Sequence, residues 1–158
     1  MEVWPGPDFG DYRALALGIG LTVASAIDIG RRLVPNYLTG TLFILGLCLN
    51  AYRDGWIGLS GSALGTVVAV GMTWWFYRRG SLGGGDVKLF AAIGATTGPY
   101  EPFIIAVYSL AVGSTIAIAI ERYRMWHGLM PGLPVVIPMA PVFACATVLA
   151  LSAPLLPH

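Results

Sequence analysis

Six long apolar runs, joined by short polar connections, make up most of this 158-residue sequence. A helix that crosses a bilayer needs about 20 mainly apolar residues. Only 11% of the residues are charged, which is too few to cover a water-soluble globule. The runs are Tyr12–Ile29, Leu38–Tyr52, Trp56–Tyr77, Val87–Gly98, Pro102–Ile120 and Val135–Leu156. We therefore predict an all-α, multi-pass membrane protein with about six transmembrane helices, in a single domain that covers residues 1–158.

The second and fourth runs are short for a full crossing, so they could instead be re-entrant or buried by their neighbours. Small residues recur at helical spacing in Gly61-x-x-x-Gly65 and in Ala91-x-x-x-Ala95. This pattern favours close packing of helices inside a bilayer.

The basic residues are unevenly divided if the six runs alternate across the membrane. Cytoplasmic loops are enriched in Lys and Arg. One side carries Arg31, Arg32, Arg78, Lys88, Arg79, Arg122 and Arg124, whereas the other carries Arg13 and Arg53. The acids Glu2, Asp8, Asp11, Asp54 and Glu101 gather on that second side. The richer side is therefore predicted to face the cytoplasm, and both termini to lie outside it.

Charge and composition also exclude several classes of function. The formal net charge is +1 and there is no basic stripe, so no nucleic-acid partner is expected. Cys48 and Cys145 lie singly in apolar runs, which predicts small buried hydrophobic side chains. His127 lies in a basic loop and His158 is the last residue, so no zinc motif is formed. We expect no metal and no cofactor.

Asp28 is an acid at the end of the first apolar run. An ionisable residue at or near membrane depth is costly, and a functional role is its default interpretation. The C-terminal end of a helix disfavours an anion, so the carboxyl should hold its proton more tightly. The alternative is an interfacial ion pair with Arg31 or Arg32.

Asp86 follows Gly83, Gly84 and Gly85 and precedes the fourth apolar run. This position predicts an N-cap, where a helix N-terminus stabilises the carboxylate. Three consecutive glycines exceed what a cap requires. They allow the backbone to approach closely or to adopt positive φ, as an extended peptide beside the carboxylate would need.

The two aspartates together suggest acid–base chemistry. Two carboxyls that share a site do not easily both ionise, so one stays protonated. The anion can take a proton from water as the water attacks a peptide carbonyl, and the acid can donate to the developing oxyanion. The helix-end argument favours Asp86 as the base and Asp28 as the acid, although a coupled pair titrates as a unit.

Two motifs in this sequence resemble the signatures of the prepilin peptidases, the type IV leader peptidase family. They are Ala26-Ile27-Asp28-x6-Pro35-Asn36 and Gly83-x-Gly85-Asp86-x-Lys88-Leu89, and the second has the GxGD form. The resemblance implies a membrane aspartic protease with Asp28 and Asp86 as catalytic residues. It implies a motif loop and substrate-binding role for Gly83, Gly84, Gly85, Lys88, Pro35 and Asn36. Pro35 and Asn36 could instead form a helix break and an N-cap.

The activity implied by this resemblance is removal of the basic leader from type IV pilin-like precursors at the cytoplasmic face of the cell membrane. The expected partners are a precursor with a basic leader and a hydrophobic helix, and the lipid bilayer. Larger members have an N-terminal region with CxxC motifs and an N-methyltransferase activity, and this sequence has neither. It looks like the short peptidases of Flp (tight-adherence) pili, with archaeal preflagellin and prepilin peptidases as the alternative.

A different class of function is a transporter in which Asp28 and Asp86 relay protons or bind a cation. That function predicts aspartates near mid-membrane and further acids along a pathway. Here both aspartates lie beside arginine-bearing connections at one face. A structural subunit with two interfacial anchors is the remaining alternative.

Overall fold

The computed structural model describes residues 12–31, 34–128 and 139–152, and every regular element in those ranges is a helix. The helices are α1 (Tyr12–Arg31), α2 (Asn36–Arg78), α3 (Gly84–Thr97), α4 (Glu101–Trp126) and α5 (Met139–Ser152). The predicted all-α class is confirmed for this part of the chain. Both termini, together with Glu2, Asp8, Asp11, Arg32 and His158, lie outside the described residues.

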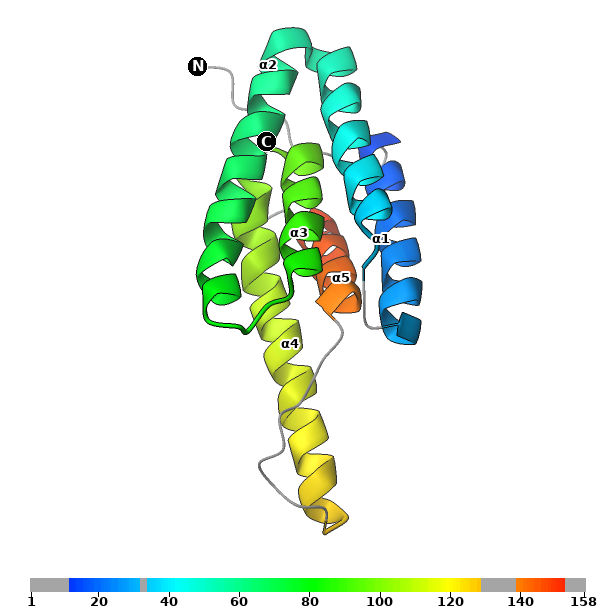
Figure 1. The fold of residues 1–158 in the computed structure, drawn as a ribbon, viewed down its shortest axis with the longest axis vertical. Coiled ribbons are helices and arrows are strands. Elements are labelled where there is room, and N and C mark those ends of the chain that lie inside the picture. The colour runs from blue at the N-terminus through cyan, green and yellow to red at the C-terminus, as the bar shows by residue number, and fades with distance from the viewer. Residues whose placement is uncertain (1–11, 32–33, 129–138, 153–158) are drawn as a thin grey trace.

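Helix α2 contains two of the predicted apolar runs and folds back on itself. Its backbone leaves helical geometry at Gly55, with φ 58° and ψ −131°, a region that favours glycine because it has no Cβ. Figure 1 shows the resulting first arm, before Gly55, and second arm, after it, running side by side from a bend at the top of the molecule. The break between the second and third predicted runs is therefore a tight helical hairpin.

Helix α3 packs against both arms of α2 (Figure 1). A Cβ at Gly65 in the second arm would overlap the carbonyl oxygen of Gly94, and one at Gly46 in the first arm would overlap Thr96. All residues of α3 from Leu89 to Thr97 are buried. A short helix that is apolar all round is suited to this central place.

A buried polar network joins α1, both arms of α2 and the end of α3. Arg13 has 0% exposure, and its Nη1 donates to Asn50 Oδ1 at 2.6 Å. Asn50 Nδ2 lies within hydrogen-bonding distance of Ser62 Oγ and of the carbonyl oxygens of Ala95 and Thr96, at 2.8, 2.8 and 3.1 Å. Sequence reasoning had placed Arg13 only among the loop charges. It is instead part of the helix packing.

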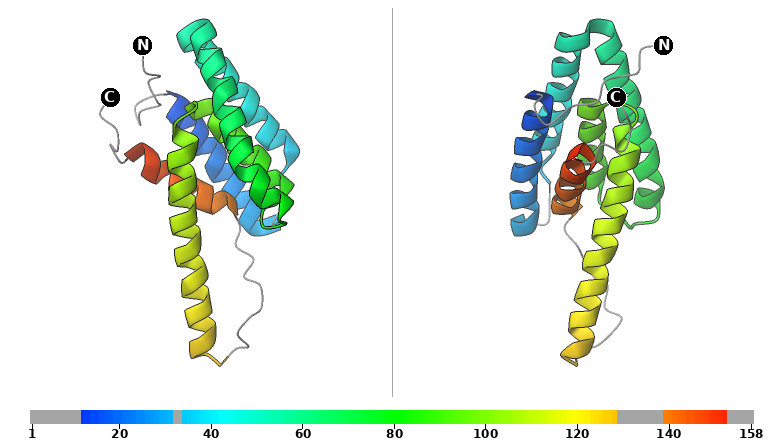
Figure 2. Two further views of the ribbon diagram at one scale, coloured as in Figure 1. Left: turned by 90° about the vertical axis from the view of Figure 1, so that its left-hand side faces the viewer. Right: turned by 180° about the vertical axis from the view of Figure 1, so that it is seen from behind.

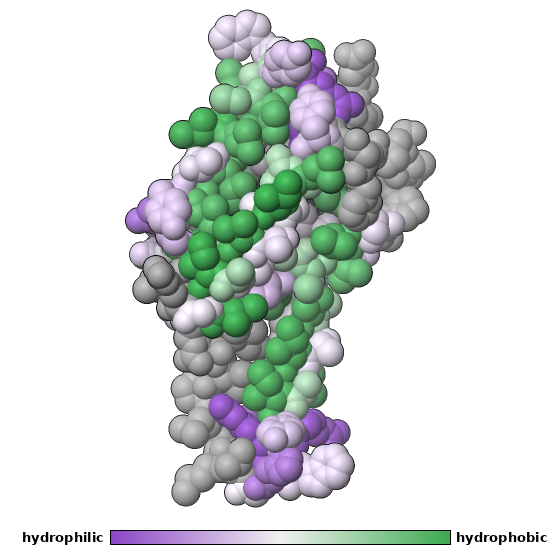
Figure 3. Space-filling model, turned by 90° about the vertical axis from the view of Figure 1, so that its right-hand side faces the viewer, coloured by the Kyte–Doolittle hydropathy of each residue, from purple (hydrophilic) through white to green (hydrophobic). Residues whose placement is uncertain are grey.

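The outer surface is strongly apolar. Three stretches are long and apolar enough to cross a membrane, namely Tyr12–Gly30, Asn36–Arg78 and Glu101–Trp126, which indicates an integral membrane protein. On the face in Figure 3, hydrophobic residues cover the middle, and hydrophilic residues gather at the upper end and at the lower tip. The prediction that both cysteines are buried was wrong, because Cys48 and Cys145 are exposed in the structure.

Helix α4 extends well beyond the other helices at the lower end of the molecule (Figures 1 and 2). None of its residues from Ala111 to Trp126 is buried. The C-terminal ends of α1, α2 and α4, which carry Arg31, Arg78 and Arg124, point the same way. The Gly55 bend lies at the opposite end of the molecule. These C-terminal ends are called the arginine-bearing ends below. The N-terminal ends of α3 and α5 lie near the arginine-bearing ends of α1 and α2.

Candidate active site

Asp28 lies in the last turn of α1 and is only 5% exposed. Its Oδ2 accepts a hydrogen bond from the backbone N–H of Ala140 at 3.1 Å. Ala140 is the second residue of α5, and the first N–H groups of a helix have no partner within it. The positive end of the α5 dipole therefore faces the Asp28 carboxylate.

Asp86 lies in the first turn of α3, ahead of the apolar run that begins at Val87. The predicted N-cap position was wrong, because α3 begins at Gly84 and Gly83 is the N-cap. Asp86 Oδ2 accepts a hydrogen bond from the backbone N–H of Gly83 at 3.1 Å. This contact is half of a capping box, in which an acidic side chain reaches back to the N-cap backbone.

The environment of Asp86 favours its protonated form. Desolvation by burial raises the pKa of this carboxyl, the Gly83 N–H lowers it, and the negative charge of Asp28 raises it further. The two carboxyls are thus close enough to influence one another. The helix-end argument had favoured Asp86 as the anion, whereas burial and the charge of Asp28 act against its ionisation.

The three glycines before Asp86 differ in what they do. None of them has positive φ, unlike Gly80 in the preceding turn. A Cβ at Gly83 would lie 3.2 Å from Asp86 Oδ2, closer than side-chain carbons normally approach. A Cβ at Gly85 would lie 3.5 Å from the carbonyl oxygen of Val34, an ordinary contact. The absence of a Cβ at Gly83 therefore leaves room for the Asp86 carboxylate. The close approach of an extended peptide to these glycines stays a prediction.

Lys88 and Asn36, which lie 52 positions apart, meet in the structure. Lys88 Nζ donates a hydrogen bond to Asn36 Oδ1 at 2.8 Å. The alternative of Asn36 as an N-cap is wrong, because Pro35 is the N-cap and its carbonyl accepts hydrogen bonds from the N–H groups of Leu38 and Thr39. The Asn36 side chain instead ties the start of α2 to the start of α3.

The N-terminus of α5 is the part of the site that sequence reasoning missed. The sixth apolar run was expected to begin at Val135, which lies outside the described residues, and α5 is described from Met139. Pro141 lies in its first turn, where proline is favoured because its missing N–H leaves no bond unmade. That signal was present in the sequence. The pairing of Ala140 with Asp28, 112 positions away, had no local signal.

Most of this chain is similar to a known protein family. Residues 15–118, which include every site residue predicted from the sequence, match the type IV leader peptidase family. The chain is 30% identical over 152 residues to a prepilin leader peptidase/N-methyltransferase of Aeromonas hydrophila, covering 92% of this chain and 50% of that protein. No solved structure gives a significant match.

Other relatives match shorter stretches. Identity to the prepilin leader peptidase/N-methyltransferase of Escherichia coli strain K12 is 38% over 109 residues, covering 63% of this chain and 48% of that protein. Identity to the prepilin peptidase EppA of Methanothermobacter thermautotrophicus is 35% over 88 residues, covering 52% of this chain and 22% of that protein. This chain spans about half the length of the two bacterial relatives.

Proposed function

Because this chain belongs to the type IV leader peptidase family, we propose that it is an aspartic endopeptidase that removes the basic leader from type IV pilin-like precursors. The observation that carries the proposal is the arrangement of Asp28 and Asp86. Each carboxyl accepts a backbone N–H at a helix N-terminus, and the charge of Asp28 acts on Asp86. Such a pair supplies a base and an acid to one reaction.

In this mechanism Asp28 is the base and Asp86 is the acid. Asp28 takes a proton from water as the water oxygen bonds to the scissile carbonyl carbon, and Asp86 donates its proton to the carbonyl oxygen. The C–N bond of the resulting diol then breaks. Asp28 returns its proton to the leaving amine, and Asp86 recovers a proton from a diol hydroxyl. Both carboxyls return to their starting states with one water consumed.

The other predicted residues hold the loop that carries Asp86. Gly83 leaves room for the carboxylate, and the Lys88 hydrogen bond to Asn36 ties this loop to the start of α2. Gly84 is exposed and leaves its backbone open to an extended peptide, whereas Gly85 packs against Val34. Pro35 ends the connection from α1 and places Asn36 within reach of Lys88.

For the membrane arrangement, we infer six crossings with the two arms of α2 counted separately, non-cytoplasmic termini, and a site that faces the cytoplasm from the cell membrane. The arginine-bearing ends of α1, α2 and α4 support this orientation. The substrate we infer is a Flp-type precursor, with an archaeal-type precursor as the alternative. The two cysteines form no CxxC pair within this chain, so the methyl transfer named for the bacterial relatives is not part of the proposal.

The test is cleavage of a purified pilin precursor by the purified protein in detergent or lipid. Wild type is compared with Asp28→Asn and Asp86→Asn, and Glu121→Gln on the projecting part of α4 is a matched carboxylate control. Both aspartate variants should lose leader removal while the control retains it. Full activity in either aspartate variant would contradict the dyad. If the wild-type protein cleaved no pilin-like precursor, the proposed substrate class would be contradicted.

A further inference from the structure

A cavity of about 570 Å³ lies between the second arm of α2 and helices α3, α4 and α5. Sites for small ligands commonly measure about 300–1,000 Å³. Its walls include Trp75 and Phe76 from α2, Phe90 from α3, Leu110 from α4 and Phe143 from α5. The cavity is therefore large enough for one or more bulky side chains, and its lining is mainly apolar and aromatic.

The cavity is lined by residues that neighbour the candidate active site in sequence, although neither aspartate lines it. Phe90 lies four positions after Asp86 on α3, so the two side chains lie on the same face of that helix, one turn apart. Met139 lines the cavity and immediately precedes Ala140, whose N–H binds Asp28. The rings of Phe90 and Phe143 pack with their centroids 5.1 Å apart. A peptide bond held between the aspartates would have this cavity beside it.

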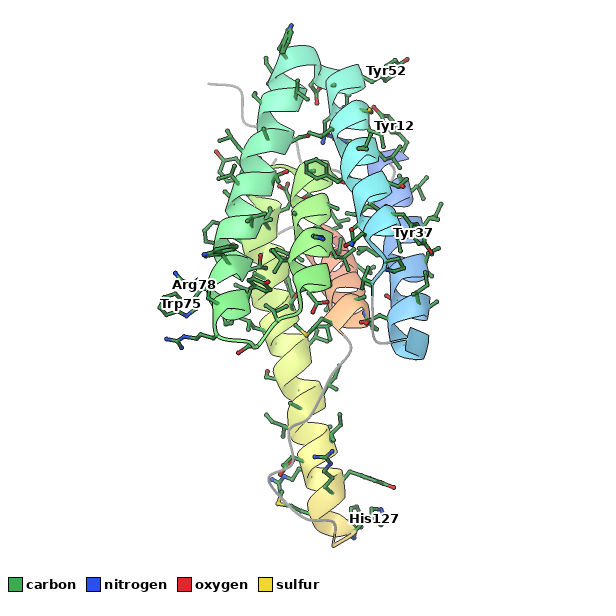
Figure 4. All side chains as sticks on the ribbon, in the orientation of Figure 1. Tyr12, Tyr37, Tyr52, Trp75, Arg78 and His127 are labelled. Carbon is green, nitrogen blue, oxygen red and sulfur yellow. The ribbon has the colours of Figure 1, made fainter. Side chains whose placement is uncertain are left out.

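The cavity is deep on one side and open on the other. Phe90 and Phe143 are buried and form its floor, whereas Trp75 and Leu110 are 59% and 61% exposed and form its rim. Trp75 projects outward beside Arg78 in Figure 4, and the guanidinium of Arg79 lies 4.4 Å from the Trp75 ring centroid. The opening thus lies on the lateral surface, between α2 and α4, where an integral membrane protein meets lipid.

The lining suits an apolar occupant. Among the described residues, no charged side chain lines the cavity. The hydroxyls of Thr73 and Ser109 donate to carbonyl oxygens of their own helices at 2.8 and 2.7 Å, so neither donor is free for a ligand. A basic peptide would lose its hydration here without compensating contacts. The basic leader must therefore lie elsewhere along the site.

We propose that this cavity binds the apolar residues that follow the cleavage point of the substrate, which enter it sideways from the lipid. This assignment rests on the proposed function and adds a specificity site to it. The occupant is peptide because the cavity residues Phe90 and Met139 lie one helical turn from Asp86 and next to the Ala140 N–H that binds Asp28. A substrate with an apolar helix can reach the lateral opening without leaving the bilayer. Lipid as the sole occupant is the competing outcome of the test.

The test narrows the cavity without disturbing the fold. Gly71 lines the cavity, and a Cβ there meets nothing within 4 Å, so Gly71→Leu should fold and project into the space. Gly18→Leu on α1 is the matched control, because Gly18 is also helical, has equal room and does not line this cavity. Both changes raise helix propensity. Ala106→Leu, with Ala111→Leu as its control, repeats the comparison on α4.

Two precursors are compared, one with a leucine and one with an alanine directly after the cleavage point. We expect Gly71→Leu and Ala106→Leu to lower kcat/KM for the leucine precursor by about 10-fold or more, and to affect the alanine precursor much less. The control variants should match wild type. Equal losses on both precursors, as expected if lipid alone fills the cavity, or no loss at all, would overturn the assignment. Failure of wild type to cleave either precursor would instead reject the proposed function.

Discussion

At Asp86 the surroundings act on one carboxyl in opposite directions. Burial and the charge of Asp28 raise its pKa, and the Gly83 N–H lowers it, with burial the largest influence. Because the pKa is raised in the folded protein, the stabilising contribution of this group is complete at low pH and is lost as pH rises through the folded-state pKa. Asp28, by contrast, accepts a hydrogen bond from the backbone N–H of Ala140 at the start of α5. The two carboxyls thus lie in different surroundings.

The first prediction concerns the coupling of these carboxyls. Asp28→Asn removes the negative charge that helps to raise the pKa of Asp86, so that pKa should fall. The measurement is an infrared titration of the protonated carboxyl band, with Asp86→Asn to identify the signal. An unchanged titration in Asp28→Asn would mean that the two groups do not share a site.

The second prediction concerns Gly83. Its backbone has φ −74° and ψ 153°, which alanine can adopt, so Gly83→Ala should fold normally. Its Cβ would lie 3.2 Å from Asp86 Oδ2 and push the carboxylate aside, which should lower kcat/KM by about 10-fold or more. Gly113→Ala on α4 is the control, since its Cβ would only contact Val142 at 3.8 Å. Equal activity in both variants would remove the steric role assigned to Gly83.

At the scale of elements, the site is made where helix ends meet. The end of α1 supplies Asp28, the start of α3 supplies Asp86, and the start of α5 supplies the N–H that binds Asp28. The start of α2 is fastened to the start of α3 through Asn36 and Lys88. Helix ends have unpaired backbone groups, which explains why polar side chains collect there in an otherwise apolar protein.

The third prediction concerns this fastening of α2 to α3. Asn36→Ala and Lys88→Ala should each lower the rate of leader removal, because each frees the loop that carries Asp86. The rate of leader removal by the double variant should be no lower than that of the less active single variant. The coupling energy between the Asn36 and Lys88 side chains should be about 1 kcal/mol. Measured kcat/KM values in a double-mutant cycle provide the test. Additive losses would show that the two side chains act separately.

The fourth prediction concerns the bend in α2. Gly55→Ala forces a side chain into positive φ and should lower stability by about 1–2 kcal/mol. Gly71→Ala in the same element is the control, because it is helical and has open space around it. Thermal unfolding in detergent provides the comparison. Equal unfolding midpoint temperatures for the two variants would contradict the positive φ at the Gly55 bend.

Sequence reasoning predicted the helices better than their ends. The apolar runs predicted the helices because their composition makes them insoluble in water. Gly55, where α2 bends, falls in the predicted gap between two runs. The caps were misplaced because backbone groups of Pro35 and Gly83, rather than the side chains of Asn36 and Asp86, begin α2 and α3. The Ala140 contact and the burial of Arg13 depend on packing between distant segments, which no local pattern records.

At the scale of the whole molecule, the charged and polar groups separate into two buried centres. The Arg13–Asn50 network lies toward the end that contains the Gly55 bend, and the two aspartates lie toward the arginine-bearing ends of the helices. Between them the described helices present an apolar surface. This arrangement is expected for a protein whose middle meets hydrocarbon, because every polar group there must find a partner inside the protein.

The fifth prediction tests that surface with the native cysteines. Cys48 and Cys145 are exposed on the protein, but lipid should cover them in a bilayer. In vesicles they should react slowly with a membrane-impermeant maleimide and faster in denaturing detergent. Tyr52→Cys, in a background that lacks both native cysteines, is the control, because Tyr52 lies near the Gly55 bend (Figure 4). Rapid labelling of the native cysteines in vesicles would contradict this embedding.

The hydrogen bond between Asp28 and Ala140 also bears on the order in which the protein is made. The ribosome synthesises α1 before α5. Ala140, whose N–H binds Asp28, is added 112 residues after Asp28, at the start of the last described helix. A nascent chain without α5 cannot present the Asp28 carboxylate to that helix N-terminus. Helix α5 therefore completes the contacts of Asp28, so the proposed cleaving activity would arise only once translation has passed α5.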